Sequence, residues 1–385
     1  MKPFDRIKQA RSWLSNDVFP LWTERGIHPE NGSFIESLNS KGQPTKTSQR
    51  SMVQARQIFS YTEAVKMRIL TSNEVIPLIQ KSTNFLIQKY SLPSGGFIHS
   101  INPQGQPEAL QTELYNQAFV IFSLARAYEM IPQENIKATA KKLLKYLETE
   151  RQAPGGGFTE IKNDQICYQS NPHMHLFEAV IEWLKVSSDP EWKQTAQDIF
   201  DLCTQKFIDP KVGVVCEFFE AGWTPIKENS RFVFEPGHQY EWAWLMIEFK
   251  KATGFDVGPF PWQIYQMAEK HGLDDSKKWV LDEIWSDFSV KKKSSRFWPQ
   301  TERIKAAVSL GLRSPMVDQA SFAKAADQSM DTLWKYLEVR GKGLWTDTKF
   351  EDGTFDQNPS KASSLYHIIK AISEYESKRP LLKAP

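Results

Sequence analysis

Four of the seven histidines lie in short polar segments that combine imidazole with carboxylate, amide or aromatic side chains. His238 and Glu241 are three residues apart, and Trp298 and Glu302 are four apart, so each pair would share one face of a helix. Imidazole titrates near neutral pH, a carboxylate binds hydroxyls, and an indole face can stack on a sugar ring. These pairs predict acid-base chemistry on a small polyhydroxylated molecule.

The other histidines of these segments differ in their spacing. His173 and His175 are two residues apart and cannot face the same ligand from one helix, which disfavours a His-x-His metal site. We interpret His173 as structural, next to the sharp turn after Asn171, and His175 as a site residue on the face of Asn171. Six polar segments of this kind occur along the chain, including some without histidine. Their residues are Arg50, Gln54, Arg56, Glu113, Tyr115, Asn116, Asn171, His173, His175, His238, Glu241, Trp298, Glu302, Ser363, Tyr366 and His367. Arg50 and Arg56 could instead belong to a charged stripe on the outside of the protein. Trp298 could instead be a core residue, with Glu302 in solvent.

The chain that carries these segments is repetitive. Turns containing glycine and an aromatic or aliphatic residue recur at steps of 56 to 65 residues, at Gly32, Gly96, Gly157, Gly213 and, two steps further, Gly343. We expect the missing fifth turn near residue 280, at Asp282 to Asp287, which contains no glycine. A fixed period of this length is typical of repeat architectures.

Apolar residues between the turns follow a helical period. We predict twelve helices, over residues 4–24, 48–70, 75–90, 112–130, 133–149, 172–186, 190–207, 237–253, 260–271, 299–310, 316–338 and 361–376. Two helices in each of six units, without a long linker, predict an all-α fold, an (α/α)6 barrel that forms one domain over residues 1–385. Its inner helices would open their positive amino ends on one face, a location suited to stabilising an oxyanion or enediolate.

Composition narrows the function classes further. The 385 residues include 48 Lys and Arg against 46 Asp and Glu, dispersed except at Lys291 to Lys293, so we expect neither a nucleic-acid nor a membrane surface. Met1 to Trp22 does not resemble a signal peptide, and three cysteines without a CxxC pair favour a reducing cytoplasm. No nucleotide motif occurs, so no nucleotide cofactor is expected. No metal is expected either, because imidazole can act as the base without one. A homodimer is left open by the sequence.

Four strings closely resemble the N-acylglucosamine 2-epimerase superfamily. They are NPHMHLFE at 171–178, EPGHQYEWAWL at 235–245, FWPQTE at 297–302 and ASSLYH at 362–367. They occur in order, and the resemblance runs from about residue 10 to 375. It implies an (α/α)6 barrel that interconverts aldoses with their C2 epimers or the corresponding ketoses. The EWAW and WPQTE segments are most similar to the mannose isomerases of that superfamily.

The resemblance also implies roles for individual residues. His238 and His367 would flank the reacting carbons, with His367 moving the proton through a cis-enediol and His238 assisting ring opening and proton transfer at oxygen. Arg50 would polarise O1 or O2, and Glu241 would orient His238 and bind hydroxyls. The remaining contacts to the sugar would come from Tyr115, Asn171, His175, Trp298 and Glu302.

The expected activity is therefore metal-independent isomerisation of a monosaccharide, of the D-mannose and D-fructose type. A 2-epimerase acting on N-acetylglucosamine or cellobiose is the nearest alternative. A glycoside hydrolase would use two carboxylates, for which Glu241 and Glu302 are the candidates. A binding protein without catalytic activity is the third alternative, because a fold does not determine a function.

Overall fold

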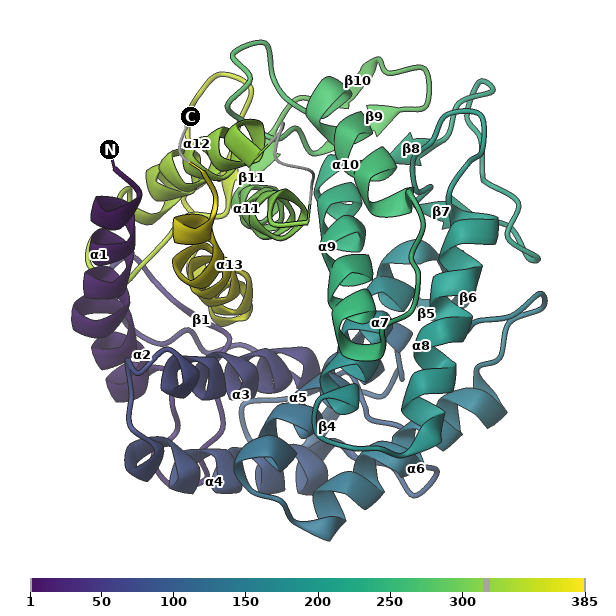
Figure 1. The fold of residues 1–385 in the computed structure, drawn as a ribbon. Coiled ribbons are helices and arrows are strands. Elements are labelled where there is room, and N and C mark those ends of the chain that lie inside the picture. Colours follow the sequence, from purple (N-terminus) through teal and green to yellow (C-terminus); the bar gives the residue numbers. More distant parts are fainter. Residues whose placement is uncertain (1, 314–318, 384–385) are drawn as a thin grey trace.

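The computed structural model describes residues 2–313 and 319–383 and is built almost entirely from helices. Six helices form an inner ring around a common axis, and the others surround it (Figure 1). The inner helices are α3 (Ser51–Lys66), α5 (Leu114–Met130), α7 (Ser170–Leu184), α9 (Pro236–Thr253), α11 (Phe297–Gly311) and α13 (Leu365–Lys378). The outer helices are α1 (Pro3–Trp13), α2 (Phe19–Arg25), α4 (Ser72–Tyr90), α6 (Glu134–Glu150), α8 (Pro190–Leu202), α10 (Phe260–His271) and α12 (Gln319–Leu337).

The ring is closed, since each inner helix packs against the next and α13 packs against α3. The predicted (α/α)6 barrel is thereby confirmed. Every predicted helix has a counterpart, and the first of them corresponds to α1 and α2 joined by a π-helical turn at Leu14–Val18. Residues 316–318 of the predicted helix 316–338 lie outside the described residues.

Burial patterns explain which helices form each layer. The outer helix α6 buries a narrow stripe whose members are three or four residues apart, namely Ile136, Ala140, Leu143, Leu144 and Leu147. The inner helix α5 is buried on all sides from Asn116 to Ala127, because it has neighbours on every side. Within the described part of the chain, no helix combines the length and apolar character needed to cross a membrane.

Short strands connect neighbouring units at the amino ends of the inner helices. They are β1 (Ser37–Leu38), β2 (Gln49–Arg50), β3 (Ser100–Ile101), β4 (Pro107–Ala109), β5 (Glu160–Lys162), β6 (Gln165–Gln169), β7 (Phe218–Phe219), β8 (Val233–Phe234), β9 (Glu283–Trp285), β10 (Val290–Lys292), β11 (Ser295–Arg296), β12 (Thr348–Lys349) and β13 (Ser360–Lys361). Antiparallel pairing gives the sheets β2-β3-β4, β5-β6-β7, β8-β9-β10 and β11-β12, and β1 with β13. The register Ser37 to Lys361 therefore links the first unit to the last.

The predicted turns close through isolated antiparallel bridges, such as Ile208 with Val215 around Gly213, which has a φ of 81°. The prediction that the fifth turn lies at Asp282 to Asp287 was wrong. The equivalent bridge joins Leu273 to Val280. Its turn needs no glycine, because Lys277 adopts a φ of 57° and the Asp274 carboxylate accepts the backbone N–H groups of the two residues that follow Lys277.

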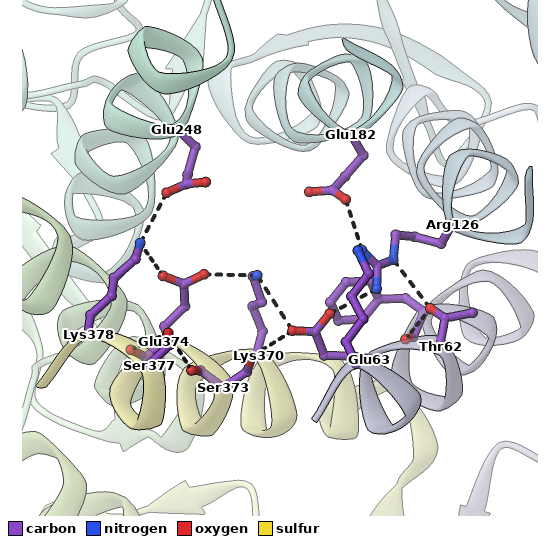
Figure 2. Close-up of polar contacts among 12 residues, drawn as sticks. Thr62, Glu63, Arg126, Glu182, Glu248, Lys370, Ser373, Glu374, Ser377 and Lys378 are labelled. Atoms are coloured by element: carbon purple, nitrogen blue, oxygen red, sulfur yellow. Dashed lines mark hydrogen bonds and ion pairs between the residues drawn. The ribbon is translucent and has the colours of Figure 1, made fainter. Parts of the chain in front are cut away.

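At the opposite end of the barrel, buried carboxylates form ion pairs with Arg126 and with the partly buried Lys370 and Lys378 (Figure 2). Arg126 of α5 binds Glu63 of α3 at 2.9 Å and Glu182 of α7 at 3.3 Å. Lys370 of α13 lies 2.9 Å from Glu374 and 3.7 Å from Glu63. Five of the six inner helices contribute to this network, in which Lys378 of α13 also binds Glu248 of α9. The charges therefore tie α13 to α3 and α9 where the ring closes.

Candidate active site

A cavity of about 410 Å³ opens where the amino ends of the inner helices converge. Its size is in the range of small-molecule sites. Its lining residues are Arg50, Met52, Arg56, Tyr115, Asn171, His175, Glu235, His238, Glu241, Arg296, Phe297, Trp298, Asp347, Lys361, Ser363, Ser364 and His367. The ring thus gathers residues that are more than 300 positions apart in the sequence.

His238 lies in the first turn of α9 and is held by a carboxylate from the preceding hairpin. Its Nδ1 donates to Glu217 at 2.8 Å, which leaves Nε2 for the cavity that the ring lines. Burial disfavours the charged imidazolium, but the carboxylates of Glu217 and Glu235 outweigh burial and raise the pKa of His238 to about 9. His238 is therefore protonated at neutral pH.

The carboxylate that holds His238 belongs to a device that recurs around the ring. Glu217 also accepts the backbone N–H of Glu235, the residue before α9. Glu36 accepts both the backbone N–H and the guanidinium of Arg50 before α3, and Asp282 does the same for Arg296 before α11. Each acid caps the positive amino end of an inner helix and fixes one side chain at the mouth. In the α9 unit the fixed side chain is a histidine.

His367, in the first turn of α13, lies in a contrasting environment. Its Nδ1 donates to Glu302 at 2.9 Å. Burial, with the positive charges of Arg56 and Lys305, holds the pKa of His367 well below its usual range, so this imidazole is neutral at neutral pH. The Trp298 ring lies between the two histidines, 5.0 Å from His238 and 5.9 Å from His367 between ring centroids.

Three residues that line the cavity carry buried polar atoms that lack protein partners. Buried atoms without a hydrogen bond include Nδ1 of His175, Oδ1 of Asn171 and both carboxylate oxygens of Glu241. Burial, reinforced by the nearby Glu302 carboxylate, raises the pKa of Glu241 well above its usual range. Burial lowers the pKa of His175 to about 4. Unsatisfied polar groups are costly in a protein interior, so this set favours a polar ligand that bonds to them.

Arg56 completes the wall beside His175. Its guanidinium donates to the Tyr115 hydroxyl at 2.6 Å and lies over the Phe119 ring, 4.1 Å from the centroid. It is 6% exposed. The alternative of a charged outer stripe therefore does not describe Arg56, which lies inside the barrel. Arg50 lies nearer the surface and is half-buried, paired with Glu36 at 2.8 Å.

The structure brings most of the predicted site residues to one cavity. Those that line it are Arg50, Tyr115, Asn171, His175, His238, Glu241, Trp298 and His367. Glu302 is fully buried behind the wall, where it contacts His367 instead of the cavity. The expectation that Glu241 orients His238 was wrong, because Glu217 occupies Nδ1 of His238. Lys305 and the cap Glu217 were missed by the sequence interpretation.

His173 has the structural role that the sequence suggested. Its Nε2 accepts the backbone N–H of Phe158 at 2.9 Å, and its Nδ1 donates to the carbonyl of Gln169 at 2.8 Å. In other units, the side chains of Gln54 and Gln117 make the corresponding bonds to the hairpin residue. His173 is thus the α7 counterpart of these glutamines.

Among the residues that the structure describes, three groups of carboxylate and imidazole donors lie close enough together for a cation. They are His175 with Glu178 and Glu241, Glu217 with Glu235 and His238, and Glu241 with Glu302 and His367. Most of these donors already serve protein contacts: Glu217 binds His238, Glu302 binds His367, and Glu178 accepts from the Tyr366 hydroxyl. Metal independence stays a prediction, and turnover measured with and without EDTA would check it.

A model of the family N-acylglucosamine 2-epimerase (GlcNAc 2-epimerase) matches residues 32–371. The chain belongs to the N-acylglucosamine 2-epimerase family. It is an enzyme of the isomerase class. A relative described as mannose-6-phosphate isomerase, from Rhizobium meliloti (strain 1021), is 31% identical over 373 residues, which cover 96% of each chain.

Solved structures of other proteins share the fold of this N-acylglucosamine 2-epimerase family member. Cellobiose 2-epimerase from Bacillus thermoamylovorans B4167 superposes with a TM-score of 0.86 at 19% identity, covering 96% of this chain and 98% of that one. A structure described as D-mannose isomerase gives a TM-score of 0.85 at 20% identity and covers 98% of both chains. At these identities the structural similarity concerns the fold alone.

Proposed function

We propose that the protein interconverts an aldose and its ketose, of the D-mannose and D-fructose type, by proton transfer through a cis-enediol. The observation that carries the proposal is that His238 and His367 line one cavity in opposite protonation states. Two titratable groups whose pKa values are driven apart are suited to act as an acid and a base. His238 is the acid, and His367 is the base.

In the proposed reaction, His367 transfers the proton at carbon and His238 transfers the proton at oxygen. Nε2 of His367 removes the proton from C2 of the open-chain aldose while His238 gives a proton to O1, which produces the enediol. His367 then returns its proton to C1, and the proton of the O2 hydroxyl passes back to His238, which yields the ketose and restores both histidines. Arg50 polarises O1 or O2, and Glu241 with Asn171 binds hydroxyl groups.

The charges at the mouth favour a neutral sugar over a sugar phosphate. Arg296 is paired with Glu235 at 2.7 Å, and Lys361 with Asp347 at 2.6 Å. Arg50 is paired with Glu36. A phosphate would have to compete with these carboxylates for each cation, so we propose an unphosphorylated monosaccharide.

An epimerase outcome differs in the second half of the reaction. His367 would deliver the proton to the other face of C2 instead of to C1, the O1 hydroxyl instead of the O2 hydroxyl would return its proton to His238, and the same residues would serve. One of the solved structures with the same fold is a cellobiose 2-epimerase, so the disaccharide belongs among the test substrates. A hydrolase is less well supported, because Glu302 is fully buried and already binds His367 and Lys305.

The test is a panel of sugars with product analysis by chromatography. Purified protein is incubated with D-mannose, D-fructose, D-mannose 6-phosphate, N-acetylglucosamine and cellobiose, each with and without EDTA. Conversion between mannose and fructose that resists EDTA supports the proposal. Turnover restricted to the phosphate, release of glucose from cellobiose, or no conversion of any sugar would each overturn it.

A further inference from the structure

Lys305 lies directly behind the proposed base and is fully buried. It is placed by α11, one helical turn after Glu302, and its Nζ lies 2.5 Å from Oε2 of that carboxylate. The other oxygen of Glu302 accepts from Nδ1 of His367. Lysine, carboxylate and imidazole therefore form a continuous line that ends at the cavity.

We propose that Lys305 is a positioning residue that keeps Nε2 of His367 free of a proton, by holding Glu302 as an anion that accepts from Nδ1. This inference rests on the proposed function of His367. An ionised Glu302 can only accept, so Nδ1 of His367 must carry a proton. In the neutral ring, which burial and the charges of Arg56 and Lys305 favour, Nε2 then presents the lone pair. The base is then in its active tautomer before substrate binds.

The surroundings of this line explain why a cation is needed there. The charged, titratable and aromatic groups that face Lys305 or His367 are Arg56 of α3, His175 and Glu178 of α7, Glu241 and Trp244 of α9, Phe297, Trp298 and Glu302 of α11, and Tyr366 of α13. Three of these are buried carboxylates. Burial raises the pKa of Glu302, and Lys305 opposes that rise.

Removal of the ammonium would leave Glu302 and His367 as a buried pair with one uncompensated negative charge. Such a pair takes up a proton more readily. If the proton resides on the imidazole, both ring nitrogens are protonated. If the proton resides on Glu302, the carboxyl O–H donates a hydrogen bond to Nδ1, and the ring proton then resides on Nε2. Either arrangement removes the lone pair that faces the cavity.

The experiment compares Lys305→Met with Lys370→Met. Both lysines lie over the Trp244 ring, with Nζ at 3.9 Å and 5.7 Å from its centroid, and both pair with buried carboxylates, Lys305 with Glu302 and Lys370 with Glu374. We expect both variants to lose thermal stability. Only Lys305→Met should move the acid limb of the kcat/KM profile upward, by about 1 to 3 pH units, with activity recovered above that limb. Lys305→Arg should keep the profile of the natural protein.

An acid limb that stays in place in Lys305→Met, or that moves equally in Lys370→Met, would overturn the proposal. If Lys305→Met does not fold, Lys305→Gln replaces it with the same expectation. NMR titration of the His367 ring, assigned with His367→Asn, needs no enzymatic activity and so separates this inference from the proposed function. In the unsubstituted protein the ring should stay neutral with its proton on Nδ1 from pH 6 to 8, and a proton on Nε2 in that range would refute the inference.

Discussion

His238 and Glu217 are joined by a hydrogen bond of 2.8 Å although 21 residues separate them in the chain. The same carboxylate caps α9, so the helix end and the imidazole are fixed by one side chain. His367 has its own carboxylate, Glu302, but that carboxylate is balanced by Lys305. The lysine that balances Glu302 thus helps to distinguish His367 from His238.

Replacing Glu217 with Gln should lower the pKa of His238, because Glu235 alone opposes burial less strongly than the two carboxylates together. Without the carboxylate, burial lowers the pKa of His238 from its present value of about 9. The alkaline limb of the kcat/KM profile is expected to move to lower pH, and activity at pH 8 should fall more than activity at pH 6. A variant whose alkaline limb coincides with that of the natural protein would show that His238 is not the acid.

The same pair should make folding stability depend on pH in a defined window. The pKa of His238 is raised from 6.5 to about 9, so its contribution to stability is complete below pH 6.5 and is lost as the pH rises through 9. Urea unfolding of the natural protein and of Glu217→Gln should therefore differ most near pH 6 and converge above pH 9. A difference that grows with pH would contradict the assignment.

His173→Gln should retain both fold and activity. The glutamines at positions 54 and 117 accept the equivalent backbone N–H in their own units, so glutamine suits this position. His173→Ala, by contrast, leaves the N–H of Phe158 without its acceptor and should cost about 1 to 3 kcal/mol of unfolding free energy. Kinetics and denaturant titrations of the two variants check this. Loss of turnover in a folded His173→Gln protein would reveal a catalytic role.

The network at the carboxyl end of the barrel should matter for stability and not for chemistry. Lys370→Met leaves the buried Glu63 and Glu374 short of a cation, which we expect to cost about 3 to 5 kcal/mol. The matched control is Lys335→Met, which breaks the exposed pair with Glu338 and should cost less than about 1 kcal/mol. Equal thermal shifts for the two variants would mean that the network does not fasten the ring.

The barrel could be predicted because its signals are local. Helical periodicity and recurring turns predicted twelve helices, each with a counterpart in the described structure, and closure of the ring followed from their number. The placement of Asn171, His175, His238 and His367 at one mouth then required only that alternate helices run parallel.

The acids behind the histidines could not be found in this way. Glu217 lies in a hairpin 21 residues before His238, and its role becomes visible only when the equivalent caps Glu36 and Asp282 are compared in three dimensions. Lys305 was present as a partner three residues after Glu302, but such spacing is typical of exposed ion pairs on a helix surface. The structure shows instead that Glu302 and Lys305 are completely buried inside the ring.

The most direct test of the central claim is the fate of the C2 proton in D₂O. Mannose and fructose are incubated with the protein and with His367→Asn, and the recovered sugars are examined by NMR. We expect deuterium at C1 of fructose and C2 of mannose, and a rate in the variant lower by about 10² to 10⁴. Conversion without deuterium incorporation, together with near-normal turnover of His367→Asn, would contradict proton transfer through this histidine.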